Sequence, residues 1–236
     1  MATLAATSSS TLTVVNLTAK NITYNLRDFI SVGNYATDAG AIVVAADAPW
    51  KTLDDFVSDA RTNPGKITYG SYGIGSLSAL NIKAIELAFG LDLVNVPFPG
   101  APQANLAVVG KHVDMSASPL SAVAAFLSDG KARALVTTAD TRLPSFPDVP
   151  TMTEKNVHQG NLKLVLVLYV VAGTPDARVS VLAKALEDTV TEPAVVQALV
   201  RAGMIVEFSD CHRARWLFER EYDDVIELGR KMNLSK

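Results

Sequence analysis

Strand-like and helix-like segments alternate through the middle of the chain, and this alternation constrains the fold more than any other feature. Each short apolar segment leads through a loop into a run whose apolar residues have helical spacing. Glycines then end these runs. Strands are expected at 67–69, 93–96, 113–116 and 132–137, and helices at about 77–89, 101–109 and 119–128. Strand–helix–strand units of this kind predict a mostly parallel sheet with right-handed crossovers.

One more helix is expected before the first of these strands. Thr52 can cap its first turn, and Asp55 follows three residues later, as in a capping box. The apolar residues from Leu53 onward fall on one helical face, and Pro64-Gly65 stops the pattern. The sequence therefore predicts a helix from Leu53 to just before Pro64.

Two apolar extended runs, 40–45 and 165–172, flank the repeated units and are interpreted as crossings between two lobes. The first lobe is expected to comprise residues 1–45 and 168–236, and the second lobe residues 46–167. After the second crossing, helices are expected at 176–191, 193–202 and 213–233, with a strand at 204–208.

Composition excludes several classes of protein. Hydrophobic residues make up 49% of the chain and charged residues 19%, which excludes a disordered chain or a coiled coil. A formal net charge of −3 argues against a nucleic-acid-binding protein. Cys211 is the single cysteine and there are three histidines, so we expect no internal disulfide, no metal site and no cofactor.

Targeting signals are also weak. The longest apolar run, 164–173, is far shorter than the ~20 residues of a membrane-spanning helix, so no direct membrane insertion is expected. No lysine or arginine precedes the apolar stretch at the N-terminus, and Lys20 is the first basic residue. This stretch is therefore not interpreted as a signal peptide.

The loop Gly70–Ser76 is the strongest local indication of a binding site. It contains three glycines, follows a strand and opens a helix, so its N–H groups can converge on an anion at a helix N-terminus. Ser71 and Ser76 add hydroxyl groups. The alternative is a plain turn that needs glycine only for positive φ. The loop matches neither the P-loop nor the dinucleotide-binding fingerprint.

The sequence gives little support for catalytic residues. No G-x-S-x-G elbow surrounds any serine. His112, His158 and His212 are better explained as surface residues than as bases or ligands. We therefore expect no catalytic residues.

The motifs together resemble those of the tripartite tricarboxylate transporter substrate-binding proteins, the Bug receptors. The most specific is the segment Arg142-Leu143-Pro144-Ser145-Phe146-Pro147-Asp148-Val149-Pro150-Thr151. Further matching segments are 48–56, 63–71, 73–76, 96–98, 100–101, 113–115, 129–135 and 172–175. Their order and spacing extend through essentially the whole chain.

The resemblance implies an α/β fold of the two-lobed, type II periplasmic-binding-protein class, with mostly parallel sheets and flanking helices. It also implies capture of a small organic carboxylate in the periplasm and delivery to membrane permease subunits. In this family the loop that matches Gly70–Ser76 receives one ligand carboxylate, in agreement with the anion argument.

The resemblance assigns three further segments to the cleft, namely Thr7–Ser9, the loop at Phe98–Gly100 and the strand end at Ser116–Ser118. The expected ligand-binding residues are Thr7, Ser8, Ser9, Ser71, Tyr72, Gly73, Gly75, Ser76, Phe98, Gly100, Ser116 and Ser118. Each hydrogen bond that such groups donate to a carboxylate is worth ~1.5–3 kcal/mol.

The sequence also departs from the family pattern. The chain starts after the family's first two strand–helix units, so we expect a truncated receptor whose first lobe is incomplete. Pro99 follows Phe98 where the family usually has a basic residue, and aliphatic residues replace the usual aromatics near 163–167. An aromatic or monocarboxylate ligand therefore stays open beside a dicarboxylate.

Two other functions stay open. One is a truncated remnant of such a receptor that binds nothing, and the other is an enzyme that acts on a phosphorylated small molecule. The exposed apolar surface of an incomplete first lobe predicts low solubility or self-association.

Overall fold

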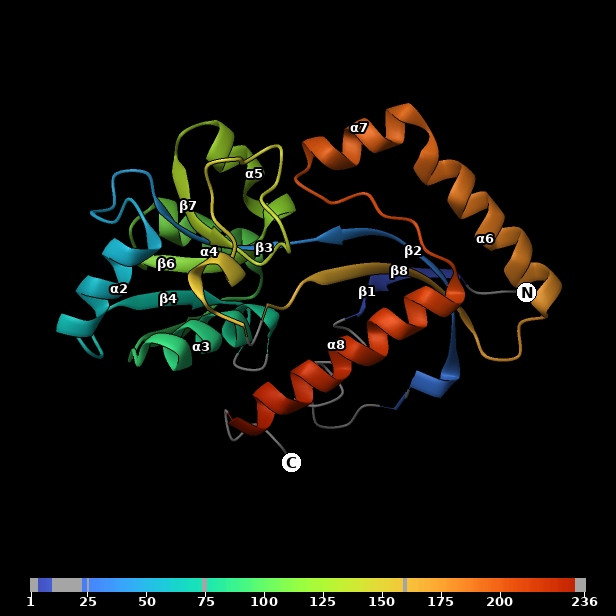
Figure 1. Cartoon of the computed structure of the whole chain (residues 1–236), viewed down its shortest axis with the longest axis horizontal. Helices are drawn as coiled ribbons and strands as arrows, with labels where there is room; N and C mark the ends of the chain where they lie inside the picture. Colours follow the sequence, from blue (N-terminus) through green and yellow to red (C-terminus); the bar gives the residue numbers. More distant parts are fainter. Residues whose placement is uncertain (1–3, 10–22, 25, 74–75, 159–160, 232–236) are drawn as a thin grey trace. The chain divides into compact units, whose positions relative to one another are not determined.

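The computed structural model describes residues 4–9, 23–24, 26–73, 76–158 and 161–231 (Figure 1). The chain divides into unit 1, residues 1–38 and 164–236, and unit 2, residues 39–163. Unit 1 contains β1 (Leu4–Ser8), β2 (Phe29–Asp38), β8 (Leu164–Val171), α6 (Asp176–Thr191), α7 (Pro193–Arg201) and α8 (Cys211–Lys231). Unit 2 contains β3 (Gly40–Ala45), α2 (Leu53–Thr62), β4 (Thr68–Ser71), α3 (Leu77–Phe89), β5 (Val94–Pro97), α4 (Ala101–Val109), β6 (Met115–Pro119), α5 (Leu120–Ser128) and β7 (Ala132–Thr137).

The sheet of unit 2 has the strand order β5-β4-β6-β3-β7. β4 pairs in parallel with β5 and with β6, whereas β3 pairs antiparallel with both β6 and β7. The four strands of the repeated units therefore all run in one direction, as their strand–helix alternation predicts. β3 runs the other way because it comes from the crossing run and inserts between β6 and β7.

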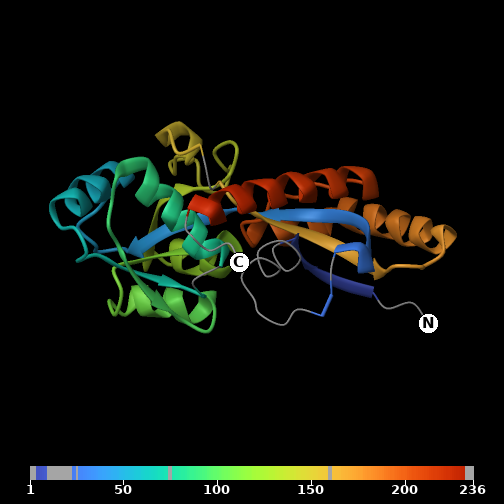
Figure 2. The same cartoon turned by 90° about the horizontal axis from the view of Figure 1, so that it is seen from below.

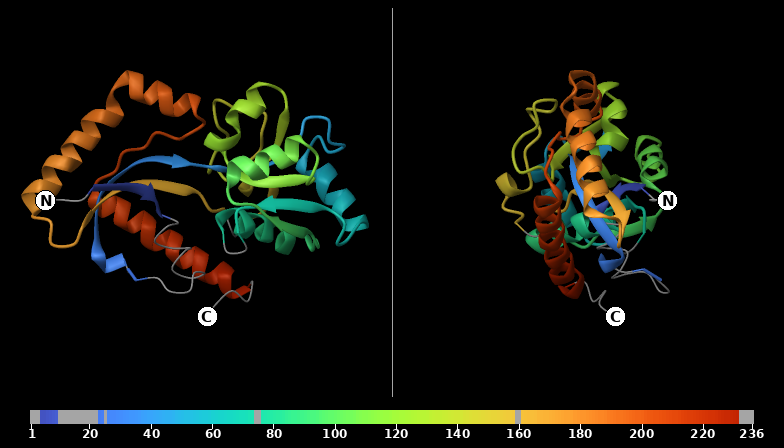
Figure 3. Two further views of the ribbon diagram at one scale, coloured as in Figure 1. Left: turned by 180° about the vertical axis from the view of Figure 1, so that it is seen from behind. Right: turned by 90° about the vertical axis from the view of Figure 1, so that its right-hand side faces the viewer.

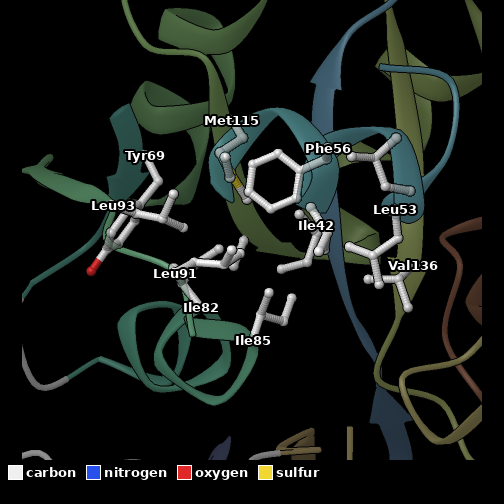
Figure 4. Packing of buried hydrophobic residues seen from close by; sticks show 14 of the residues in the cluster. Ile42, Leu53, Phe56, Tyr69, Ile82, Ile85, Leu91, Leu93, Met115 and Val136 are labelled. Atoms are coloured by element: carbon white, nitrogen blue, oxygen red, sulfur yellow. The ribbon is translucent and has the colours of Figure 1, made fainter. Parts of the chain in front are cut away.

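Helices cover both faces of this sheet. α2 and α3 supply Phe56 and Ile85 to a core that also contains Ile42 of β3 and Met115 of β6 (Figure 4). α4 packs on the opposite face, where Ala107 and Val108 meet Val113. Figure 2 shows α3 and α4 on opposite sides of the strands. Alternate side chains of one strand therefore meet different helices.

The sheet of unit 1 has the order β1-β8-β2 (Figure 3), and both pairings are antiparallel. This departs from the expected mostly parallel arrangement. β2 leads out of unit 1 and β8 leads back into it, so these two strands run in opposite directions, and β1 is also antiparallel to β8. The expected strand at 204–208 is not formed. Ile205 makes an isolated bridge with Thr37, and Ser209, just beyond the expected strand, makes one with Asn34.

The lobe boundaries also require a correction. The chain divides after Asp38 and before Leu164, and not at 45/46 and 167/168 as expected. The reason is hydrogen bonding. All of β3 pairs with strands of unit 2, and all of β8 pairs with β1 and β2.

The capping box predicted at α2 is confirmed. The Asp55 N–H donates to Thr52 Oγ1 at 3.1 Å, and the Thr52 N–H donates to Asp55 Oδ2 at 2.9 Å. The Lys51 N–H donates to the same carboxylate at 3.0 Å. Hydrogen bonding with the Thr52 side chain, followed by the N–H groups of Lys51 and Thr52, holds the pKa of Asp55 below its ordinary value.

Replacing Asp55 by asparagine is expected to lower the Tm at neutral pH. A carboxyl group whose pKa is lower in the folded protein stabilises the fold above its unfolded pKa. That contribution is lost as the pH falls through the folded pKa. Thermal unfolding of both proteins from neutral pH to pH ~2.5 should therefore show a Tm difference that shrinks on acidification. A difference that is constant across this range would contradict the assignment.

Side chains of unit 2 form hydrogen bonds with the backbone where the chain enters this unit and where it leaves it. The Gly40 N–H donates to Thr138 Oγ1 at 2.7 Å, and the Thr138 N–H donates to the Gly40 carbonyl at 2.8 Å. The Leu162 N–H donates to Asn81 Oδ1, and Asn81 Nδ2 donates to the Leu162 carbonyl, both at 3.1 Å. Asn81 and Leu162 are buried.

Replacing Asn81 by alanine is expected to lower the free energy of unfolding by about 1–3 kcal/mol, because two buried backbone groups of Leu162 lose their partner. Ser78→Ala on the same helix is the matched control. The Ser78 hydroxyl is buried and has no hydrogen-bond partner among the described residues, so its removal should be neutral or stabilising. Urea unfolding measures both. Equal effects of the two variants would refute the role of Asn81.

Candidate functional site

The carboxyl edge of the unit 2 sheet collects three helix N-termini. α3 follows β4, α4 follows β5 and α5 follows β6, and these strands are neighbours in the sheet. None of the three helices carries an aspartate or glutamate in its first turn. The first N–H groups of a helix have no partner inside it and form the positive end of its dipole. This edge therefore collects the positive ends of three helix dipoles that no acidic first-turn residue offsets.

At the opposite edge of the same sheet, the helix begins with acidic residues. α2 follows β3, whose last residue, Ala45, pairs with the first residue of β7. The first turn of α2 contains Asp54 and Asp55, so its own carboxylates complement its dipole.

The β4–α3 loop is held by its own hydroxyl groups. Ser71 Oγ donates to Asn95 Oδ1 on β5 at 2.7 Å. Ser76 caps α3, accepting from the Ala79 N–H at 3.3 Å and donating to the Gly73 carbonyl at 2.7 Å. Gly73 has φ 122°, a backbone conformation that side chains disfavour, so glycine is required there. Tyr72 is half-buried in this loop, and the predicted residue Gly75 lies outside the described residues.

The β5–α4 loop contributes the Phe98 ring and a helix N-terminus that has no side-chain cap. A Cβ added to Gly70 would lie 3.2 Å from Phe98 Cε2, so the ring lies against the Gly70 backbone. Phe98 and Val96 also pack against the cluster of Ala107, Val108 and Val113. Gly100 is the N-cap of α4; its carbonyl accepts from the Ala104 N–H at 3.2 Å, and without a side chain it makes no side-chain capping bond.

The β6–α5 segment contains a buried hydrogen-bond network. Ser116 Oγ and Ser118 Oγ donate to Asn105 Oδ1 of α4 at 3.0 and 2.6 Å. Asn105 Nδ2 donates to the Ala122 carbonyl of α5 at 3.1 Å. The three polar side chains are 0–2% exposed. Ser116 and Ser118, both expected to bind the ligand, thus donate their hydroxyl hydrogens to Asn105.

Sequence reasoning missed Asn95 and Asn105. The signal for Asn105 was available, because it is an amide among the apolar residues on the buried face of α4. Asn95 gave no comparable signal, since it lies half-buried in an edge strand.

The remaining predicted residues belong to unit 1. Thr7 and Ser8 lie in β1, where they pair with Val167 and Leu166 of β8. Ser9 follows the strand, is fully buried, and donates its hydroxyl to the Glu221 carboxylate on α8. The structure therefore places Thr7–Ser9 in a different unit from the eight other predicted residues that it describes.

Two negative observations concern the described part of the chain. It contains no group of three histidine, cysteine, aspartate or glutamate side chains that could hold a metal ion. Within the same residues, no helix has both the length and the apolar character needed to cross a membrane.

Comparison with solved structures establishes the fold. One described as a periplasmic transporter superposes with a TM-score of 0.89 at 26% identity, covering 98% of this chain and 78% of its own. R. palustris Rpa4515, solved with adipate, has the same TM-score at 19% identity, with 99% of this chain and 78% of its own covered. These likenesses confirm the expected type II periplasmic-binding-protein fold.

Sequence comparison gives the family. A UPF0065 protein of Bordetella pertussis is 28% identical over 197 residues, which is 84% of this chain and 61% of that relative. The chain thus spans less than two thirds of the relative's length. The family model described as tripartite tricarboxylate transporter family receptor, TctC, matches residues 2–227. The chain belongs to the tripartite tricarboxylate transporter receptor family.

Proposed function

We propose that this chain binds a small organic carboxylate at the carboxyl edge of the unit 2 sheet, as the solute-binding part of an extracytoplasmic receptor. The receptor acts without catalysis and hands its ligand to the membrane permease subunits of a tripartite transporter. The observation that carries the proposal is the set of three neighbouring helix N-termini without an acidic first turn.

The donors in this proposal are mainly backbone N–H groups. The hydroxyls of Ser71, Ser76 and Ser118 donate to protein acceptors at 2.6–2.7 Å, which leaves their lone pairs rather than their hydrogens for a ligand. A carboxylate requires donors. We therefore place the ligand against the first turns of α3, α4 and α5, with Tyr72, Gly73 and Gly100 beside it.

The ligand class rests on the family and on one solved neighbour. The matching family model describes tricarboxylate transporter receptors, and Rpa4515 was solved with adipate, a dicarboxylate. Several helix N-termini along one edge suit a ligand with more than one carboxylate, because each group can meet a separate helix end.

Thermal unfolding with a ligand panel tests the proposal. The panel is succinate, adipate, citrate and benzoate, with adipamide as the uncharged control for adipate. A carboxylate present at 100 times its Kd should stabilise the protein by ~2.7 kcal/mol, and titration calorimetry should give one site per chain. Adipamide should give no shift.

Two outcomes would overturn this function. No shift with any carboxylate would favour a remnant without a binding site. Hydrolysis of a phosphate ester such as p-nitrophenyl phosphate would favour an enzyme that uses the β4–α3 loop for a phosphate group.

A further inference from the structure

Two short stretches of chain connect unit 1 to unit 2. The first passes from Asp38 to Gly40, and the second passes from Leu162 to Leu164. Inside unit 1 the two stretches belong to neighbouring strands, because Asp38 of β2 is paired in register with Leu164 of β8. The two connections therefore leave unit 1 as one antiparallel ribbon that is paired up to its last residues.

The first connection is held in unit 2 by backbone pairing. Gly40 begins β3, which lies between β6 and β7 in the sheet. The Ala39 carbonyl accepts from the Leu120 N–H at 2.8 Å. The Thr138 hydroxyl adds one bond by accepting from the Gly40 N–H at 2.7 Å. Loss of this side chain would therefore leave the first connection anchored by the strand.

The second connection is held by a side chain instead. Leu162 lies outside any strand, and its N–H and carbonyl are both bonded to the Asn81 amide, each at 3.1 Å. Asn81 is 3% exposed and Leu162 is 4% exposed. A side-chain amide carries an acceptor oxygen and N–H donors, as a peptide group does. Asn81 thus supplies to Leu162 the two bonds that a neighbouring strand would supply.

Other side chains near Leu162 constrain the connection less. Asn161 donates to Thr153 at 2.9 Å and Lys163 donates to Asp140, and both bonds are exposed. Exposed polar bonds compete with water and contribute little to stability. The buried anchor of the second connection is therefore Asn81.

Asn81 also lies beside the first connection. A Cβ added to Gly40 would be 3.2 Å from Asn81 Nδ2. The two connections therefore enter unit 2 next to each other, on either side of one buried side chain of α3.

We propose that the two units pivot on a two-point hinge at Ala39 and Lys163, and that Asn81 is the positioning residue that fixes the second point. One residue in each connection lies between the last strand pair of unit 1 and the first residue that unit 2 bonds through both backbone groups. Rotation of the units must use the backbone torsions at these residues. Two fixed points allow rotation about the line that joins them. Release of the second point adds twisting about the first connection.

Distances between spin labels on the two units, measured by pulsed electron spin resonance on the full chain, test the hinge. Cys211, the single cysteine, is replaced by serine, and labels are attached at Ser58→Cys on α2 and Ser180→Cys on α6, which are exposed positions. Asn81→Ala should broaden the distance distribution and add distances that the wild type lacks. An unchanged distribution in this variant would overturn the proposal.

Thr138→Val is the matched control. It also removes a side-chain bond from a connection, but it keeps the pairing of β3. Its distance distribution should equal that of the wild type, whereas its Tm should fall, as in Asn81→Ala. Equal broadening in both variants would overturn the proposal, because the effect would then follow stability and not the second hinge point.

Hydrogen exchange of the wild type provides a readout that does not require a variant to fold. The Leu162 amide should exchange as slowly as the amides of β3, although it lies outside any strand. In Asn81→Ala this amide should exchange about tenfold faster, as expected for the loss of a buried hydrogen bond. Fast exchange of the Leu162 amide in the wild type would overturn the proposal, because Asn81 would then not hold the second connection.

Discussion

Replacing Phe56 by alanine is expected to lower the free energy of unfolding by about 3–5 kcal/mol. Phe56 lies on the buried face of α2, is 0% exposed, and meets the Trp50 ring edge-on at a centroid distance of 5.4 Å. The substitution removes this aromatic contact and leaves a cavity between α2 and β3 in the core of unit 2 (Figure 4). Urea unfolding should show a lower midpoint for the variant.

The two tryptophans allow this loss to be assigned to one unit. Trp50 is buried in unit 2, and Trp216 lies on α8 of unit 1 with 45% of its surface exposed. In a Trp216→Phe background, fluorescence follows Trp50 alone, and the midpoint should fall strongly when Phe56→Ala is added. Leu87→Ala, at an exposed position of α3, is the control and should change the midpoint little. A similar fall for Leu87→Ala would contradict the assignment of the core.

The helices and strands of unit 2 could be predicted because their signals are local. The apolar spacing, the glycine at 90 and the Thr52–Asp55 capping box all act within a few residues, and the structure has α2 and α3 where they were expected. The antiparallel insertion of β3 could not be predicted in this way. Its neighbours, β6 and β7, are set by pairings with residues far along the chain.

The role of the serines depended on partners that the sequence does not bring together. Ser71 finds its acceptor 24 residues away in Asn95, and Ser118 finds its acceptor 13 residues away in Asn105. From the sequence alone, a serine at the end of a strand can donate its hydroxyl hydrogen either to a ligand or to another group of the protein. Which of the two receives the hydrogen is decided by tertiary packing.

The unit 1 segment Thr7–Ser9 likewise has partners that its own sequence does not reveal. Its polar residues resemble a ligand-binding stretch, yet Thr7 and Ser8 form an edge strand on β8 and Ser9 donates to Glu221 on α8. The partner is 212 residues away along the chain. Ligand contact by this segment stays a prediction.

Replacing Gln103 by glutamate should weaken carboxylate binding by about ten- to a hundredfold at low salt. Gln103 is the third residue of α4, and its Oε1 would lie 3.1 Å from a Cβ at the N-cap Gly100, so the side chain folds back over the helix end. A negative charge about 6 Å from a bound carboxylate costs roughly 1.4–2.8 kcal/mol at an effective dielectric constant of about 20–40. Calorimetry with adipate measures the loss, and added salt should reduce it.

Stability should respond in the opposite direction, which separates loss of the site from loss of the fold. A glutamate in the first turn complements the helix dipole, so the Tm of Gln103→Glu should equal or exceed that of the wild type. Gln197→Glu makes the same chemical change on α7 of unit 1, at another exposed glutamine, and should leave adipate binding unchanged. If Gln103→Glu binds adipate as tightly as the wild type, the α4 N-terminus is not part of the site. If both variants weaken binding equally, net charge, and not the helix end, controls the affinity.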